Sequence, residues 1–324
     1  MATHSRYRTL MVGLTVAAVV LCLLILVWNN PLPFGSPGFW VIAKRRLLSI
    51  VVILVAALCH GVATVTFQTI TANRILTPSI IGFEALYRLL HTSVVFFFGI
   101  AAVAKAVTLG EYLLQVALMV GLAMALYGWL LVWRRTSIHQ MLLVGLILAS
   151  AMTGLTAFMQ RMLSPTAFDV LLARLIGSIA NAETDMLVFA APTALVAAGV
   201  IFFLARTLNV MALGRPVAVG LGVNYERMTL VFLGLISVLM AVTTSLIGPI
   251  SFLGFLTAMI TYQLAQSFDH RQLLPMVWLV GVVTLAGAYF TLRHLVYAQG
   301  SVGIIIEMVG GVFFLTYLLR KGRL

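Results

Sequence analysis

Charged residues are scarce in this 324-residue chain: they make up 9% of it, and only eight are Asp or Glu. Hydrophobic residues make up 62%, and the mean hydropathy is +1.13. A soluble domain carries more charge than this, so the scarcity excludes a soluble enzyme or a soluble binding module. We therefore interpret the chain as an integral membrane protein with many spans.

Cysteine and catalytic motifs are lacking as well. Cys22 and Cys59 both lie in apolar stretches, where a thiol packs as a small hydrophobe, so a disulfide framework is excluded. The sequence has no His/Asp/Glu group with metal-ligand spacing, no phosphate loop ending in Gly-Lys-Ser/Thr and no Gly-x-Ser-x-Gly elbow. We expect no enzyme activity, no cofactor and no bound metal.

Apolar stretches of about 20 residues, enough to cross the bilayer, recur along the whole chain. They predict an all-α, polytopic membrane protein with about ten transmembrane helices, in a single transmembrane domain over residues 1–324. The first stretch is long and lacks a small-residue cleavage site, which favours a retained helix over a signal peptide. The expected spans are 10–28, 48–70, 79–104, 112–133, 138–160, 186–206, 228–247, 250–267, 273–292 and 302–319.

The 20 basic residues give a net charge of +12 but lie at the ends of the spans. This pattern indicates topology signals and lipid contacts rather than nucleic-acid binding. The positive-inside rule predicts that both termini are cytoplasmic. Three connections are then long: outer loop 29–46, outer segment 161–185 and inner segment 207–227. The basic cluster 44–46 runs against the rule; it either docks an acidic partner or contacts headgroups.

Two helix breakers, Gly248 and Pro249, interrupt apolar sequence. Inside a bilayer the backbone groups that they leave unpaired must be satisfied by protein or by a water-filled cavity. The stretch is either part of a translocation path or a simple capped turn, since both residues are common in membrane helices. One span later, Asp269-His270-Arg271 forms a charged turn.

Ionisable groups within the spans are few. Glu84 and Arg88 are four residues apart, which favours an ion pair on one helix face over a transport role. Glu307, in the last span, either hydrogen-bonds a neighbouring helix or lines a pathway. An ion-coupled secondary transporter needs buried charges in several spans, so this class is disfavoured but stays open as an alternative.

The inner segment is apolar on the aqueous side of the membrane. Pro216 suits the first turn of a short helix, which Gly220 and Gly222 would end. The exposed apolar residues that result, such as Val217 and Leu221, either dock onto a cytoplasmic protein or lie on lipid.

Several of these segments, in order, resemble the FecCD family of ABC-transporter permeases, ten-span subunits of importers for iron-siderophores, haem and vitamin B12. The matching positions are Gly61, Gln68, Asn73, Pro78 and Gly82; Met211-Ala212-Leu213-Gly214 with Ala218 and Leu221-Gly222; Gly248-x-Ile250-x-Phe252-Leu253-Gly254; Asp269-His270-Arg271-x-Leu273-Leu274-Pro275; and Gly303-Ile304, Gly310 and Phe313-Phe314. The sequence departs from the family pattern at Arg74, Arg215, Ala258-Met259 and Ser301.

The run from Phe67 to Ile80 and the ending Glu307-x-x-Gly310-Gly311 look most like the branch for catecholate-type siderophores such as petrobactin, anguibactin and vibriobactin. The resemblance implies the type II ABC importer permease fold in the bacterial cytoplasmic (inner) membrane. The implied cargo is a ferric siderophore, with haem or vitamin B12 as the alternative. The implied partners are a dimer of cytoplasmic ABC ATPase subunits, an extracytoplasmic substrate-binding protein and a second permease, with a heterodimer favoured.

The resemblance also implies roles for individual residues. ATPase coupling is expected at Ala212, Leu213, Gly214, Ala218, Leu221, Gly222, Asp269, His270 and Arg271. Docking of the binding protein is expected at Arg45, Arg46 and Arg293. The translocation path and its hinge are expected at Gln68, Gly248, Pro249 and Gly254.

Overall fold

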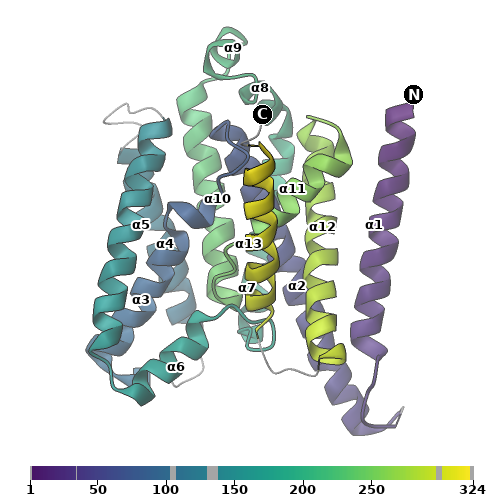
Figure 1. Cartoon of the computed structure of the whole chain (residues 1–324), viewed down its shortest axis with the longest axis vertical. Helices are drawn as coiled ribbons and strands as arrows, with labels where there is room; N and C mark the ends of the chain where they lie inside the picture. Colours follow the sequence, from purple (N-terminus) through teal and green to yellow (C-terminus); the bar gives the residue numbers. More distant parts are fainter. Residues whose placement is uncertain (1, 34, 103–106, 130–137, 297–300, 322–324) are drawn as a thin grey trace.

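The computed structural model describes residues 2–33, 35–102, 107–129, 138–296 and 301–321, and the regular structure within these ranges is helical. Figure 1 shows a bundle of helices that run roughly along its long axis. The start of the first helix and the end of the last lie at one end of the bundle, the same end as the short helices α8 and α9, which comprise Ala205–Met211 and Arg215–Gly220. The prediction of an all-α fold is confirmed.

Each of the ten predicted spans overlaps a different main helix. The helices are α1 (Ala2–Val27), α2 (Pro37–Ile70), α3 (Phe83–Phe98), α4 (Leu109–Gly128), α5 (Ile138–Arg161), α7 (Leu187–Phe203), α10 (Tyr225–Ile247), α11 (Leu253–Ala265), α12 (His270–Phe290) and α13 (Val302–Lys321). Within the described residues, seven helices are long and apolar enough to cross a membrane, while α11 and α13 offer shorter apolar stretches and α3 has 16 residues. The predicted ends at 104 and 133 lie outside the described residues.

Short helices fill the connections. A 3₁₀ turn, η1 (Pro78–Ile81), precedes α3, and η2 (Ile100–Ala102) follows it. The predicted outer segment 161–185 contains α6 (Pro165–Leu175) and η4 (Thr184–Met186), and the π-helical η5 (Thr291–Leu295) continues α12.

The outer loop predicted at 29–46 is shorter than expected, because α2 begins at Pro37. The Ser36 hydroxyl accepts a hydrogen bond from the Phe39 N–H at 3.2 Å, and proline suits the first helical position. Lys44, Arg45 and Arg46 therefore lie on a helix rather than in a loop. The Pro/Gly-rich composition of this stretch had suggested a loop to residue 46, but the helix begins directly after the cap at Ser36.

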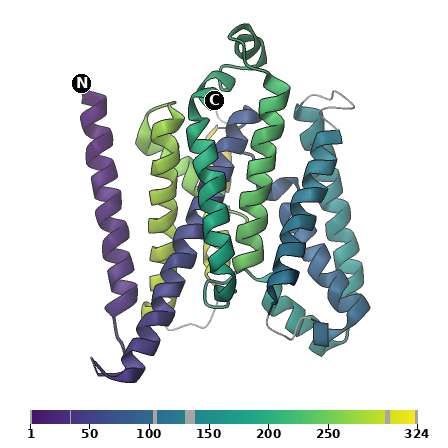
Figure 2. The same cartoon turned by 180° about the vertical axis from the view of Figure 1, so that it is seen from behind.

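Helices α2 and α10 form the centre of the bundle. In each of these helices, 72% of the residues in the most apolar stretch are buried within the protein, against 11% in α1. Seen from behind, α1 lies at one edge of the molecule, where it packs on α12 and α2 (Figure 2). Most of α1 thus faces outward, as expected of a lipid-exposed helix.

Glycines let α2 approach α12 closely. A Cβ at Gly281 would lie 3.0 Å from the Cβ of Ala57, and one at Gly61 would lie 3.2 Å from the backbone oxygen of Val277. Small residues at helix contacts allow this packing in membranes. The two helices form a tightly fitted pair through the middle of the bundle.

Candidate functional site

The predicted break lies between α10 and α11, at the end of the bundle opposite α9 (Figure 1). Gly248 ends α10 with φ +80°, in a region that favours glycine, and its N–H donates to the Thr244 carbonyl at 2.9 Å. The chain then runs as an irregular segment to Leu253, where α11 begins.

Three glycines from separate connections meet at this break. A Cβ on Gly177 would lie 2.3 Å from the carbonyl oxygen of Pro249, one on Gly248 would lie 3.1 Å from Gly177 Cα, and one on Gly303 would lie 2.7 Å from the Gly177 oxygen. The Ser178 N–H donates to the Ile247 carbonyl at 2.8 Å, and the Gly303 N–H donates to the Gly177 carbonyl at 3.2 Å. We call Gly177, Gly248 and Gly303 the glycine junction. It joins the break to the start of α13 and to the segment after α6.

Sequence reasoning singled out Gly248 but missed Gly177. The sequence signal at Gly177 was weak, because an isolated glycine after an apolar helix is common in any turn. The Gly248 N–H and the Ile247 carbonyl at the break are thus bonded within the protein, and Gly248 also lines the cavity described below.

Glu84 pairs with the break rather than with Arg88. Its side chain is buried on α3, and its Oε2 accepts a hydrogen bond from the Ser251 hydroxyl. No direct ion pair joins Glu84 to Arg88 in the part of the chain that the structure describes, so the prediction of a direct pair is wrong, although the charge of Arg88 acts on Glu84. The i,i+4 spacing was compatible with a pair, but the break brings a hydroxyl group closer. Glu307, half-buried on α13, lies within electrostatic range of Glu84.

At the opposite end, Asn209 connects three helices. Its amide donates to Asp269 Oδ1 at 2.8 Å, and its carbonyl oxygen accepts from the His270 backbone N–H at 2.9 Å and lies 2.6 Å from His270 Nδ1. The other ring nitrogen of His270 is 2.7 Å from the Thr69 hydroxyl of α2. This Asn209 network ties α8 to the start of α12 and the end of α2.

Asp269 caps α12 and stays ionised. Burial alone would raise the pKa of its carboxyl, but hydrogen bonds from Asn209 and the Arg271 N–H, together with the positive charge of Arg271, hold the pKa below its usual value. A negative charge at a helix N-terminus is favourable. The structure thus brings the predicted Asp269 and His270 together with α8.

Helix α9 projects beyond the rest of the bundle (Figure 1). As predicted, Pro216 lies in its first turn and Gly222, with φ +84°, follows its end. Ala218 is fully buried, whereas Leu213 and Leu221 are 61% and 62% exposed. Val217 and Val219 are exposed as well, so the tip of the protein presents apolar side chains.

Gln68 lies at the other end of the bundle from the break, whereas Gly254 lies in the first turn of α11, directly after the break. Gln68 is buried at the end of α2 nearest α8, where its Nε2 donates to the Arg74 carbonyl at 2.6 Å. The Arg74 guanidinium lies 4.6 Å from the ring centroid of Tyr262. A Cβ at Gly254 would lie 3.2 Å from the His60 carbonyl oxygen, so this glycine permits contact between α11 and α2.

Arg46 makes contacts within the protein. Its guanidinium donates to the carbonyls of Ile25, Leu26 and Trp28, the last at 2.7 Å, and to that of Asn29 at 3.2 Å. The last carbonyls of a helix have no partner within it, and a cation there is favourable. Arg46 therefore closes the end of α1, while Arg45 and Arg293 are exposed.

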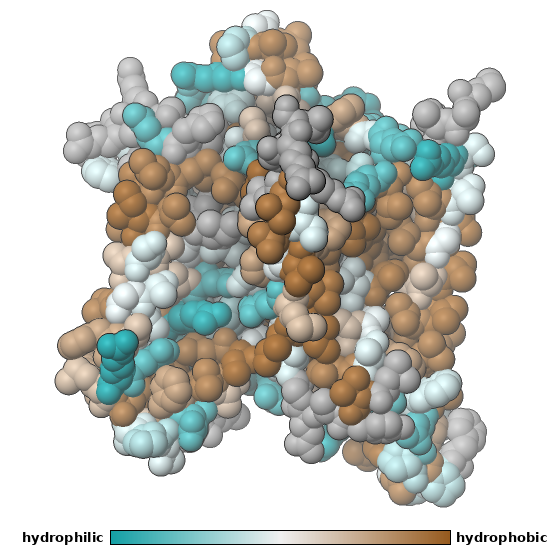
Figure 3. Space-filling view, viewed as in Figure 1, coloured by the Kyte–Doolittle hydropathy of each residue, from teal (hydrophilic) through white to brown (hydrophobic). Residues whose placement is uncertain are grey.

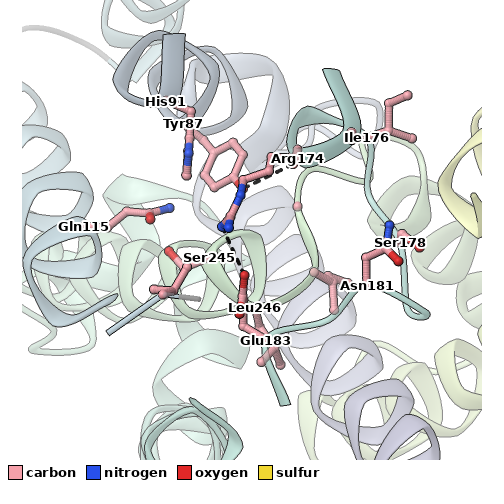
Figure 4. Close-up of a pocket in the computed structure, with 14 residues that line it drawn as sticks. Tyr87, His91, Gln115, Arg174, Ile176, Ser178, Asn181, Glu183, Ser245 and Leu246 are labelled. Carbon is pink, nitrogen blue, oxygen red and sulfur yellow. Dashed lines mark hydrogen bonds and ion pairs between the residues drawn. The ribbon is translucent and has the colours of Figure 1, made fainter. Parts of the chain in front are cut away.

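A polar cavity of about 220 Å³ lies beside the break (Figure 4). Arg174, at the end of α6, crosses it to form an ion pair with Glu183 at 3.1 Å. His91 of α3, Gln115 of α4 and Ser245 of α10 line it as well. The sequence did not indicate that these residues form a group, because they come from four helices.

Hydrophilic side chains also gather on one face of the molecule. Figure 3 shows them in a largely hydrophobic surface, between α13 and the side formed by α3 and α5. This hydrophilic area lies partway along a bundle that crosses a membrane. Water or protein must therefore lie against it.

Comparison with known proteins gives consistent matches along the chain. A family model described as the FecCD transport family matches residues 9–321. The chain is 42% identical to the petrobactin import system permease protein FatC of Bacillus anthracis over 319 residues, covering 98% of this chain and 90% of that protein. It is 29% identical to the petrobactin import system permease protein YclO of Bacillus subtilis (strain 168), covering 97% of each.

The fold also matches a solved structure, described as an inward-facing conformation of a putative metal-chelate type ABC transporter. The TM-score is 0.82 at 21% identity, over 97% of this chain and 99% of that one.

Proposed function

The chain belongs to the FecCD transport family, and we propose that it is the membrane-spanning permease subunit of an ABC importer for iron siderophores. The observation that carries this conclusion is the match to FatC along 98% of the chain. The sequence contains no nucleotide-binding loop, so the energy for transport comes from a partner ATPase.

Petrobactin is the first cargo to test, because FatC and YclO are both named as petrobactin permeases. We expect that a strain lacking its own petrobactin permeases recovers uptake of labelled ferric petrobactin when this chain is expressed together with an ATPase, a binding protein and a second permease of a petrobactin importer. The same cells with the gene for this chain left out serve as the control. Uptake of haem or vitamin B12 without petrobactin would favour the alternative cargo, and no uptake of any of the three would contradict the proposal.

The translocation path is proposed to run along the face that contains α13, with the break at Gly248-Pro249 as its hinge. Two features support this: the hydrophilic area beside α13 (Figure 3), and the bond from Ser251 to Glu84, which holds the segment after Pro249 against α3. A second permease packed on this face would enclose the hydrophilic area. We favour a heterodimer, since FatD, another relative named as a petrobactin permease, is 30% identical over 59% of this chain.

The α8–α9 segment is proposed to bind the ATPase. Leu213 and Leu221 are large, apolar and exposed at the tip, and exposed apolar groups of this kind mark protein contacts. The Asn209 network supports a role for Asp269 and His270 in passing movement from α8 to α12. Both termini then lie on the cytoplasmic side of the bacterial inner membrane, at the same end as α9.

The binding protein is proposed to dock at the other end, through Arg45 and Arg293. We expect Arg45→Glu to weaken its binding about fivefold at low salt, the scale of an exposed ion pair, without lowering the melting temperature. Arg46→Glu should instead lower the melting temperature, because the carbonyls at the end of α1 lose their donors. Titration of the binding protein and thermal unfolding in detergent measure the two effects. Unchanged affinity of Arg45→Glu at low salt would contradict docking at this residue.

A further inference from the structure

The segment that connects α6 to η4 lies across the end of α10. It comprises residues 176–183, and we call it the strap. The Ser178 N–H donates to the Ile247 carbonyl at 2.8 Å, and the Glu183 N–H donates to the Leu246 carbonyl at 3.0 Å. The last carbonyls of a helix have no partner within it. The strap therefore supplies donors for two carbonyls at the end of α10, directly before the break.

The strap also holds the start of α13. The Gly177 carbonyl accepts one hydrogen bond from the Gly303 N–H at 3.2 Å and another from the Ser301 hydroxyl. Both donors lie at the beginning of α13. The strap is thus bonded to the end of one helix and to the start of another, so a displacement of the strap releases both.

An ion pair joins the two ends of the strap. Arg174 lies in the last turn of α6, Glu183 is the last residue of the strap, and the two side chains are 3.1 Å apart (Figure 4). The side chains are 24% and 28% exposed, so water screens this pair less than it screens a pair at the surface. The Tyr87 hydroxyl donates to the Arg174 carbonyl at 3.4 Å, which ties the same end of α6 to α3.

The polar cavity of Figure 4 lies between the strap and α10. Ser178, Asn181 and Glu183 line it from the strap, and Ser245 lines it from α10. Ser245 is 8% exposed, and its Oγ has no hydrogen-bond partner among the described residues. Protein interiors are normally close-packed. On the side of the cavity, the strap is therefore held by its hydrogen bonds and by the ion pair rather than by packing.

We propose that Arg174 and Glu183 are positioning residues for transport. Their ion pair keeps the strap on the ends of α10 and α13, and the strap leaves α10 when the hinge at Gly248-Pro249 moves. The pair thereby sets the fraction of molecules in which the strap is in place. This inference rests on the proposed function, which assigns the hinge to the break.

A thiol in the cavity reports on the strap. Ser245→Cys replaces a largely buried hydroxyl with a thiol of similar shape, which a bulky maleimide reaches when the strap is displaced. The importer is purified with its ATPase in lipid nanodiscs, and the reaction is followed by mass spectrometry. The importer without this substitution gives the background from Cys22 and Cys59. We expect Glu183→Gln to raise the reaction rate about fivefold, the scale of one ion pair.

A double variant tests whether the two residues act through one bond. Arg174→Gln should raise the rate as well, and the variant with both substitutions should react no faster than Arg174→Gln alone. Asp185→Asn is the matched control, because it removes an exposed carboxylate two residues beyond the strap; it should leave the rate unchanged. Single effects that multiply in the double variant, or an equal rise in Asp185→Asn, would overturn the role of the pair.

ATP distinguishes a strap that moves during transport from one that is only structural. Addition of ATP should change the reaction rate of the Ser245→Cys importer, because the strap moves with the hinge. Equal rates with and without ATP would overturn the movement of the strap. The reaction requires no cargo, so a failure of siderophore uptake would contradict the proposed function and would leave this result standing.

Discussion

Gly177→Ala is expected to reduce siderophore uptake about tenfold or more, although it adds only one methyl group. That methyl would lie 2.3 Å from the Pro249 carbonyl oxygen and 2.7 Å from the Ile250 side chain, and the first of these atoms is backbone. Overpacking of this kind costs about 1–3 kcal/mol, and about 1.4 kcal/mol changes an equilibrium tenfold. The added methyl group raises the free energy of the arrangement in which the three glycines of the glycine junction are in contact. The equilibrium between the transport states therefore shifts away from this arrangement.

Gly154→Ala is the control for this substitution. A Cβ at Gly154 would meet no atom within 4 Å, and alanine favours a helix. The two variants should reach the membrane in equal amounts and differ in uptake of labelled ferric siderophore. Normal uptake by Gly177→Ala would contradict the close contact at the junction, and so the proposed hinge.

Leu221→Asp is expected to separate the permease from its ATPase. Leu221 is 62% exposed at the tip of the protein, and the substitution would bury a charge in an apolar contact. Central interface residues contribute about 2 kcal/mol or more, which corresponds to a loss of affinity of roughly 30-fold. Co-purification of the ATPase should fall below detection in detergent, and transport should stop.

Two further variants test whether charge or shape is responsible. Asn224→Asp adds the same charge nearby and keeps an acceptor for the Arg227 N–H, which Asn224 already caps. Leu221→Met keeps an apolar side chain at the contact. Both should retain the ATPase. Co-purification with Leu221→Asp at the normal level would contradict binding at α9.

Seven of the helices were predictable because length and hydrophobicity alone define a span, whereas α3, α11 and α13 are shorter within the described residues. The short helix α9 was also predictable, since Pro216 and Gly222 are local signals for its start and end. The beginning of α2 was missed because the prolines and glycines of 29–38 were interpreted as a loop that continued to residue 46, whereas Ser36 caps a helix that starts at Pro37. Local reasoning is reliable where the physical cause lies within a few residues.

The junctions between distant segments were not predictable. The contact of Gly177 with Pro249 and the bond from Ser251 to Glu84 join segments far apart in the chain. They depend on how α3, α6 and α10 pack, and spacing within one helix carries no information on that. The bonds of Arg46 to the carbonyls of α1 could not be predicted either, and its predicted role in docking the binding protein stays a prediction.

The Asn209 network also has a consequence for the two ends of the bundle. It attaches α8 to α2, a helix of 34 residues that is about 50 Å long at about 1.5 Å per residue. Gly61 and Gly281 allow the middle of α2 to pack closely against α12. This close packing stiffens both helices against bending. Arg46 near the other end of α2 bonds the last carbonyls of α1, so we expect a displacement of α2 along its axis to carry the end of α1 with it.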